Sequence, residues 1–414
     1  MIIGSAIVGL LLGVSFTSFV GRGYLKGKEY HLWRWQADTV LEVAFARLGI
    51  GPDPSDTAGL PALESYFKLT SQIRTALQPS DPDVQLVDTL TSERAAYEND
   101  VEHLIERWIA EATGSAGLQQ SLPLFHGVRF TWPPVAFELT SPPQLLVRSP
   151  RKEIRRAGDR LLKNDLTIGD IEKIEDRADN DDKVSIVVAI WRWRLGYHPY
   201  RPDNDDTVSI VVAIGGLAAY PAIVRDDRSF DSMLETAAHE WTHHYLAFYP
   251  LGQRFGKRPD GTTLNETTAD LAGRELANLI RKAHPVELTP GEDGRIPAGP
   301  APTVDFNKEM RAVRLAVDIL LADGKVAEAE TLMEEKRLYL VANGINLRKL
   351  NQAYFAFYGS YAASSAASDP IGPKVDRVWD LTKDVGVFLR FMRQVESTAD
   401  LDALIAKLET VPKP

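Results

Sequence analysis

The sequence predicts an α+β fold, in which a mixed or antiparallel sheet is followed by a large helical lobe. Residues 122–147 alternate apolar and polar side chains between prolines, which is typical of short strands joined by turns. Two short apolar runs, 184–190 and 208–214, predict buried strands. Apolar residues at helical spacing then recur through four later segments, namely 305–321, 326–342, 347–362 and 373–395.

We expect the chain to divide into four consecutive parts. They are an apolar anchor at 1–21, a helical juxtamembrane region at 22–121, an α+β lobe at 122–283 and a helical lobe at 284–414. A chain of 414 residues is long enough for one large two-lobed domain or for two smaller domains. The start of the last part, 284–303, is rich in proline and glycine and reads as a loop.

The amino-terminal segment predicts a single-pass membrane anchor. Residues 1–20 carry no charged side chain, and this length suits a membrane-spanning helix. A cleaved signal peptide is the alternative, but a basic start and a small-residue cleavage site are both missing. Arg22 and Lys26 follow the apolar run and favour a cytoplasmic catalytic part, yet an upstream segment would change this count, so the membrane side stays open. Gly9 and Gly13 predict at most a weak homodimer contact through the anchor.

Further helices are predicted on either side of the first strands. Helical spacing covers residues 29–48 and 92–113, and a glycine-containing linker lies between them at 51–59. After the strands, a basic helix is expected at 151–163 and an acidic helix at 167–178.

Residues 179–190 recur almost unchanged at 203–214. Only Lys183 and Thr207 differ between the two copies, which indicates a local duplication. Each copy predicts an acidic turn that leads into a buried strand. Calcium binding by these turns is disfavoured, because neither turn has the full ligand spacing of a calcium loop.

Five consecutive residues beginning at His239 read His-Glu-Trp-Thr-His, which is the zinc-peptidase pattern H-E-x-x-H. A capping-box-like run at 232–235 offers the start of a helix. On that helix His239 and His243 project from one face toward one ion. Glu240 follows the first ligand, where its carboxylate can reach a water on the metal without ligating the metal. His244 would point about 100° away from His243 and is therefore predicted not to bind the metal.

A third protein ligand is expected downstream, because a catalytic zinc has three protein ligands and an open position for water. Residues 264–270 read Leu-Asn-Glu-Thr-Thr-Ala-Asp at the start of another predicted helix, which runs to about Ala283. Glu266 and Asp270 face the same way on that helix. One of these carboxylates would bind zinc, while the other accepts the free ring N–H of a ligand histidine.

H-E-x-x-H followed by N-E-x-x-x-D resembles the pattern of the gluzincins, the thermolysin-like zinc peptidases. The resemblance implies a zincin-like, two-lobed fold that binds Zn²⁺ through His239, His243 and Glu266. It also implies that Glu240 is the general base and that Asp270 is the hydrogen-bond partner of His239.

The implied reaction is hydrolysis of a peptide bond in a peptide or protein substrate. Zinc polarises the carbonyl and activates water, and Glu240 carries a proton from that water to the leaving amine. In gluzincins an extended peptide pairs with an edge strand, a role for residues 217–224 unless they form one more strand of the sheet. The candidate donors to the developing oxyanion, with core packing as the alternative, are Tyr354, Tyr358 and Tyr361.

Composition and charge narrow the remaining possibilities. The net charge of −10, without a Lys/Arg cluster, argues against nucleic-acid binding. The absence of cysteine excludes disulfides, cysteine nucleophiles and thiolate zinc sites. The alternatives to a peptidase are a hydrolase of another amide or ester, a zinc-bearing but inactive membrane scaffold, and a metal-free membrane assembly factor. Glu240 disfavours the scaffold, which has no need of a base.

Overall fold

The structure is a computed structural model of the 414-residue chain. It describes residues 27–32, 35, 59–79, 81–121, 129–150, 158–180, 207–257, 259–289, 291–294, 302–359, 361, 364, 366–367 and 370–410. Its helices and small sheets confirm the predicted α+β class. The anchor predicted at 1–21 lies outside these residues. Within the described ranges, no helix combines the length and the apolar character needed to cross a membrane.

The described residues form two compact units, and each unit is assembled from separate stretches of the chain. Unit 1 takes its described residues from Met1–Ala37, Pro143–Ile214 and Pro300–Asp369, and unit 2 from Asp38–Pro142, Gly215–Gly299 and Pro370–Pro414. This division differs from the four consecutive parts that we expected, because helices of the expected lobe 284–414 belong to both units.

Unit 1 contains a three-stranded antiparallel sheet of order β5-β4-β6. β4 (Gln144–Pro150) lies between β5 (Gly158–Leu162) and β6 (Thr207–Ala213). β6 confirms the strand predicted for the second repeat copy, whereas the strand of the first copy lies outside the described residues. The basic helix predicted at 151–163 is wrong for residues 158–162. These residues form β5, which pairs along β4 and contributes to the buried core.

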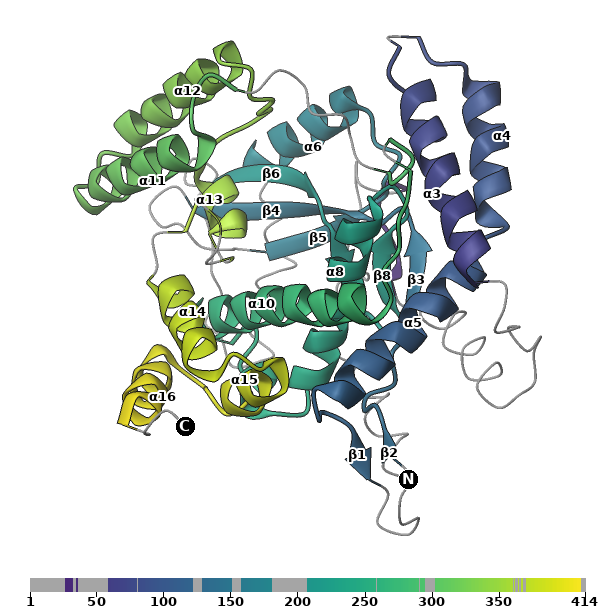
Figure 1. Cartoon of the computed structure of the whole chain (residues 1–414). Coiled ribbons are helices and arrows are strands. Elements are labelled where there is room, and N and C mark those ends of the chain that lie inside the picture. The colour runs from purple at the N-terminus through teal and green to yellow at the C-terminus, as the bar shows by residue number, and fades with distance from the viewer. Residues whose placement is uncertain are drawn as a thin grey trace. The chain divides into compact units, whose positions relative to one another are not determined.

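The acidic helix predicted at 167–178 is confirmed by α6 (Ile168–Asn180), which packs beside β6 in Figure 1. Thr167 and Asp170 cap its first turn reciprocally. The Thr167 hydroxyl accepts the Asp170 N–H at 3.1 Å, and the Asp170 carboxylate accepts the Thr167 N–H at 3.3 Å. Buried side chains from the sheet and the helix form one core, namely Leu146, Leu162, Ile174, Ala178 and Val211.

The first residues of the expected helix 29–48 are extended, so that prediction is wrong for residues 29–31. Glu29 forms an antiparallel bridge with Leu162, and the Tyr30 N–H donates to the Leu161 carbonyl at 3.0 Å. Residues 32 and 35 are helical, and most of the rest of that predicted helix lies outside the described residues.

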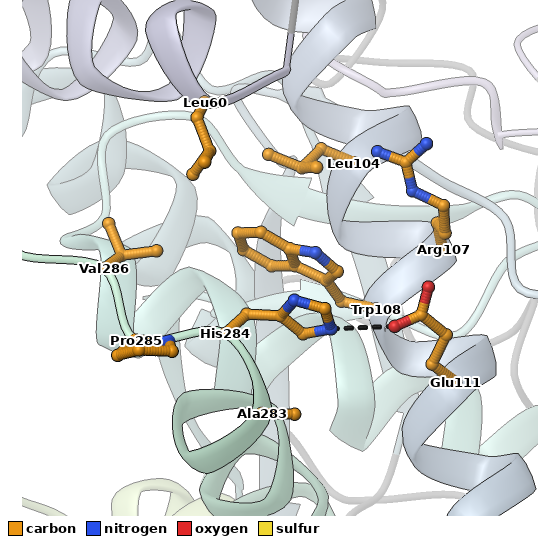
Figure 2. Close-up of a pocket in the computed structure, with 9 residues that line it drawn as sticks. All are labelled: Leu60, Leu104, Arg107, Trp108, Glu111, Ala283, His284, Pro285 and Val286. Carbon is orange, nitrogen blue, oxygen red and sulfur yellow. Dashed lines mark hydrogen bonds and ion pairs between the residues drawn. The ribbon is translucent and has the colours of Figure 1, made fainter. Parts of the chain in front are cut away.

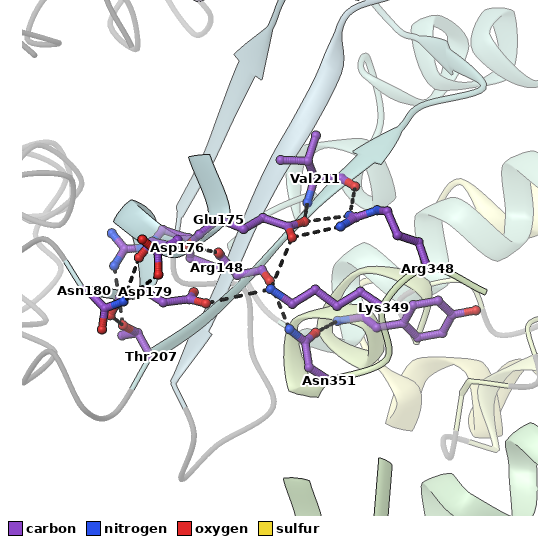
Figure 3. A network of polar contacts seen from close by, with 12 residues as sticks. Arg148, Glu175, Asp176, Asp179, Asn180, Thr207, Val211, Arg348, Lys349 and Asn351 are labelled. Atoms are coloured by element: carbon purple, nitrogen blue, oxygen red, sulfur yellow. Dashed lines mark hydrogen bonds and ion pairs between the residues drawn. The ribbon is translucent and has the colours of Figure 1, made fainter. Parts of the chain in front are cut away.

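A buried carboxylate on α6 holds β6 and residues 348–349 together (Figure 3). Glu175 accepts hydrogen bonds from Arg348 at 2.6 and 2.9 Å, from Lys349 at 3.2 Å and from the Val211 N–H at 2.6 Å. Charge pairing and hydrogen bonding on both oxygens offset the desolvation of this carboxylate.

The helical segments predicted in unit 1 are mostly confirmed. α11 (Phe306–Ala322) is capped by Asp305, whose carboxylate accepts the Lys308 N–H at 3.1 Å. α12 (Val326–Ala342) has the predicted bounds and packs against α11. α13 (Gln352–Tyr358) is shorter than the predicted helix 347–362, because Asn351 caps its start.

Unit 2 begins with α3 (Gly59–Ala76), α4 (Val84–Ala95) and α5 (Glu98–Ser115), which pack against one another. The continuous helix predicted at 92–113 is therefore interrupted at 96–97. The last turn of α4 carries the buried Arg94, whose guanidinium pairs with Asp226 at 2.6 Å and fixes the end of that helix.

The sheets of unit 2 confirm the mixed strand directions that we expected. One sheet has the order β3-β8-β7, with β3 (Phe137–Thr140) parallel and β7 (Gly216–Leu217) antiparallel to the central β8 (Ala222–Arg225). The predicted segment 217–224 thus contributes an edge strand and a central strand. A small antiparallel pair is formed by β1 (Gln120–Ser121) and β2 (Arg129–Phe130).

Helix α5 covers the outer edge of β3 with two carboxylates. The Leu139 N–H donates to Glu102 at 2.5 Å, and the Phe137 N–H donates to Glu106 at 3.0 Å. Backbone donors that would otherwise be unpaired at a strand edge are thereby satisfied. Burial raises the pKa of Glu102 well above its usual value, although the Leu139 hydrogen bond opposes this shift.

We expect Glu102 to make the free energy of unfolding depend on pH. Because its pKa is higher in the folded chain, the folded state binds more protons above the unfolded pKa of about 4.3, and stability falls as pH rises through the interval to the folded pKa. Glu102→Gln keeps an oxygen for the Leu139 N–H and should show a smaller decline. Urea unfolding of both proteins across this pH range measures the difference, and parallel profiles would contradict the prediction.

The carboxyl-terminal part of unit 2 contains α14 (Ile371–Thr382), α15 (Val385–Met392) and α16 (Thr398–Thr410). The single helix predicted at 373–395 is interrupted at Lys383, which has a φ of 50° and ends α14 in a left-handed conformation. Asp384 then caps α15 by accepting the Val387 N–H at 2.7 Å.

Candidate metal centre

The two histidines of the motif lie on α8 (Phe230–Leu246). Its N-cap is Ser229, which accepts the Ser232 N–H and lies three residues before the start of the predicted capping box at 232–235. Its apolar face is fully buried and fixes the rotation of the helix, with Met233, Leu234, Ala238 and Trp241 in the core. His239 and His243 consequently project together from one side, as their spacing predicts.

The carboxylates predicted to complete the site lie on α10 (Pro259–Ala283), which packs against α8 (Figure 1). This helix begins five residues before the predicted 264 and ends at Ala283 as expected. Gly273 allows the two helices to approach closely. A Cβ atom there would lie 2.9 Å from the His239 backbone nitrogen and 3.0 Å from the Glu235 carbonyl oxygen, which leaves no room for a side chain.

Three potential ligand atoms converge between these helices. The two Nε2 atoms of His239 and His243 are 2.9 Å apart, and Glu266 Oε2 lies 3.6 Å from the first and 3.4 Å from the second. Ligands about 2.0–2.1 Å from a tetrahedral zinc ion are separated by about 3.3 Å, so this triangle has the size that such an ion requires. The structure therefore brings together the three residues that the sequence proposed as ligands.

The other ring nitrogen of each histidine is held by an oxygen acceptor. His239 Nδ1 donates to Asp270 Oδ1 at 2.9 Å, and His243 Nδ1 donates to Asn265 Oδ1 at 2.6 Å. When both rings are neutral and carry their protons on Nδ1, they direct Nε2 lone pairs toward each other and toward Glu266. This electron-rich arrangement favours a cation at its centre.

The sequence prediction assigned no role to Asn265. It occupies the first position of N-E-x-x-x-D, directly before Glu266, and that adjacency is the signal that could have identified it. Asp270 lies where the gluzincin resemblance puts it, beside His239.

Charge interactions within the cluster shift two pKa values in opposite directions. Burial would lower the pKa of His239, but hydrogen bonds to Asp270 and Glu266 overcome that effect and raise it well above its usual value. Burial would raise the pKa of Glu266, but the charges and hydrogen bonds of His243 and His239 hold it well below its usual range. The first shift favours the protonated, positively charged His239, and the second favours the ionised, negatively charged Glu266.

Glu240 lies in the same cluster and is 5 % exposed. One of its oxygens lies within 4.8 Å of ring nitrogens of both His239 and His243. Its carboxylate packs against Gly216 of the edge strand β7, where a Cβ atom would lie 3.0 Å from Glu240 Cδ. Burial raises the pKa of Glu240, which is the direction that proton exchange near neutral pH requires.

His244 turns away from the cluster. Its Nε2 donates to the Ala219 carbonyl in the segment that joins β7 and β8, and its ring meets Tyr220 edge to face at 5.4 Å. Burial lowers the pKa of His244 to about 4, so the ring is neutral at physiological pH. These contacts agree with its predicted non-ligating role and assign it to holding the β7–β8 segment against α8.

The three candidate oxyanion donors belong to unit 1. Tyr354 and Tyr358 lie on α13 with ring centroids 4.4 Å apart, and Tyr361 follows that helix. Burial raises the pKa of both Tyr354 and Tyr358. Because the metal cluster lies in unit 2, the oxyanion role of these tyrosines stays a prediction.

Comparison with known proteins yields no relatives. No family model, curated protein or solved structure matches the chain.

Unit 2 also contains a pocket of about 630 Å³ whose lining shares no residue with the metal cluster. Figure 2 shows the indole of Trp108 against the imidazole of His284, which are stacked at 4.9 Å, with Glu111 accepting from His284 Nε2 at 2.7 Å. The apolar side chains of Leu60, Leu104 and Val286 also line the pocket. This pocket is lined by α3, α5 and the carboxyl end of α10.

Proposed function

We propose that the protein is a zinc-dependent peptidase of the gluzincin type. The observation that carries the proposal is the triangle formed by His239 Nε2, His243 Nε2 and Glu266 Oε2, with sides of 2.9, 3.4 and 3.6 Å. Two imidazoles and one carboxylate are the donor set of the best-known catalytic zinc sites with three protein ligands. We also propose that unit 2 is zincin-like, since it packs α8 and α10 beside the mixed sheet β3-β8-β7.

Each residue of the cluster has a separate task in this proposal. His239, His243 and Glu266 would hold zinc, which would polarise a substrate carbonyl and lower the pKa of water. Asp270 and Asn265 orient the two imidazoles through their Nδ1 atoms. Glu240 would accept a proton from the attacking water on its carboxylate oxygen and return it to the leaving amine.

A peptide is the substrate that the neighbouring strand favours. β7 pairs with β8 on one side and with no other described strand, and its Gly216 lies against Glu240. An extended chain that pairs with the free side of β7 would pass beside the proposed base.

We further propose that residues 1–20, which carry no charged side chain, attach the protein to a membrane.

Metal content and peptide hydrolysis of the full chain test this function. We expect about one zinc ion per chain, hydrolysis of members of a mixed peptide library, loss of both after chelation and return of both on addition of zinc. A folded, zinc-supplemented protein that binds no zinc would overturn the proposal. Zinc without peptide hydrolysis would favour the alternatives, an inactive scaffold or a hydrolase of another amide or ester.

Replacing Asn265 by Ala should weaken zinc binding by about 10–100-fold, because His243 would lose the acceptor that fixes its tautomer and orientation. Competition with a chromogenic chelator measures this affinity. Asn265→Asp keeps an oxygen acceptor and should bind zinc more tightly than the alanine variant. Unchanged affinity in Asn265→Ala would contradict the role assigned to this residue.

A further inference from the structure

Arginines gather where β8 ends, around two consecutive aspartates. Arg94 donates to Asp226 twice, at 2.6 Å to the carboxylate and at 2.8 Å to the backbone carbonyl. Arg225 donates to the Asp227 carboxylate through two hydrogen bonds of 2.7 and 2.6 Å. Each aspartate therefore already has one guanidinium partner.

Two further arginines approach the same place. Arg74 of α3 donates to the Asp227 backbone carbonyl, and its charge is also attracted by Asp293. Arg228, which directly follows Asp227, makes no hydrogen bond or ion pair with any residue that the structure describes, and its Nε is buried without a partner. Arg74, Arg225 and Arg228 thus all lie near the carboxylate of Asp227, whose two oxygens accept hydrogen bonds from Arg225.

The guanidinium of Arg228 is energetically unfavourable without an anion, because its buried Nε has no hydrogen-bond acceptor. Desolvation lowers the pKa of Arg228, and the neighbouring charge of Arg225 lowers it further. A half-buried guanidinium without a partner lacks the pairing that normally offsets such desolvation. An anion near Arg228 would supply that pairing, and a carboxylate matches a guanidinium because both are planar and two hydrogen bonds can form between them.

The position of Arg228 connects this charge to the metal cluster. Its Nη2 atom lies 3.7 Å from the Cβ position of Gly215, and the next residue, Gly216, packs against Glu240. Since consecutive Cα atoms are about 3.8 Å apart, the Arg228 guanidinium and the Glu240 carboxylate are at most about 13 Å apart. An extended peptide rises about 3.3 Å per residue, so this distance corresponds to about four residues or fewer.

We propose that Arg228, supported by Arg74 and Arg225, binds a carboxylate of the substrate within about four residues of the cleaved bond. The inference rests on the proposed peptidase function and specifies its substrate class. The carboxylate belongs either to the carboxy terminus of the peptide or to an Asp or Glu side chain. A guanidinium binds either carboxylate in the same way, and the experiment distinguishes the two sources.

Peptide binding to the zinc-supplemented full chain carrying Glu240→Gln tests the inference without requiring hydrolysis. A hexapeptide library is prepared in three forms: with free carboxy termini, with amidated termini, and amidated with one added Asp or Glu. We expect at least one carboxylate-bearing form to bind about 10-fold more tightly than the plain amides, since hydrogen bonds to charged groups are the stronger ones. The form that gains identifies the source of the carboxylate.

Adding Arg228→Gln should abolish that advantage and leave binding of the plain amides unchanged. Arg377→Gln is the matched control, because it removes an exposed arginine charge from α14 of the same unit and should preserve the advantage. If Arg228→Gln does not fold, Arg228→Lys should retain a reduced advantage, because an ammonium cannot form the planar pair.

Equal binding of all three forms, or an advantage that survives Arg228→Gln, would overturn the inference. The proposed function would still stand if the wild-type protein hydrolysed amidated peptides. Conversely, a carboxylate advantage that depends on Arg228 in a protein without hydrolytic activity would support the anion site and overturn the peptidase alone.

Discussion

Replacing Glu240 by Gln is expected to reduce peptide hydrolysis by about 10²–10⁴-fold and to leave zinc bound, because an amide cannot accept the proton of the attacking water. The substitution preserves the volume that packs against Gly216, so the edge strand should not move. The three proposed ligand atoms are untouched, since they belong to His239, His243 and Glu266. Turnover number and zinc content of the same preparation are the two measurements.

A carboxylate elsewhere on α8 provides the control. Glu235 pairs with Arg281 at 2.5 Å near the start of the same helix, and Glu235→Gln should retain near-normal turnover. Zinc loss in Glu240→Gln would mean that Glu240 is a ligand instead of the base, an arrangement that its place among the clustered side chains also permits. Full turnover without zinc loss would remove Glu240 from the mechanism.

The residues of the candidate metal site could be predicted in pairs, because helical spacing places two of them on one face of each helix. His239 and His243 are one turn apart on α8, and Glu266 and Asp270 are one turn apart on α10. The gluzincin resemblance then paired the two helices and assigned a separate role to each carboxylate. The distances agree with that pairing, since Glu266 approaches both Nε2 atoms and Asp270 approaches His239 Nδ1.

Sequence patterns could not predict the contacts between segments that are distant in the sequence. Nothing near Gly216 or Gly273 in the sequence indicates that each must lack a side chain, because the atoms that exclude a Cβ belong to α8. Strand β5 was equally hard to predict from the sequence. The segment 158–162 has a helical pattern, but its hydrogen-bonding partner in β4 makes it a strand.

The two compact units are also not evident from the sequence, for a physical reason. Proline and glycine in the sequence locate loops. They do not reveal that α11–α13 belong to unit 1 with the β5-β4-β6 sheet, or that α14–α16 belong to unit 2 with the candidate metal site. The tyrosines of α13 were considered oxyanion donors because of their chemistry alone. Their assignment to unit 1 leaves that role as a prediction.

Replacing Gly273 by Ala should disrupt the metal cluster, although the same change in an ordinary helix interior is stabilising by about 1 kcal/mol. The new Cβ would lie 2.9 Å from the His239 nitrogen and 3.0 Å from the Glu235 oxygen, and both obstructing atoms belong to backbone that cannot rotate away. Separation of α8 and α10 would move His239 and His243 away from Glu266. We expect a loss of about 1–3 kcal/mol in the free energy of unfolding and about 10²-fold in turnover.

Gly169→Ala distinguishes this steric effect from helix propensity. Gly169 lies in α6, and a Cβ there meets nothing within 4 Å, so its replacement should leave stability and turnover unchanged or slightly increase stability. Urea unfolding, zinc affinity and turnover of both variants provide the comparison. If Gly273→Ala stabilised the protein as an ordinary helical substitution does, the close crossing of α8 and α10 would be incorrect. The convergence of the three ligand atoms depends on that crossing, so this one methyl group tests the geometric basis of the proposed zinc site.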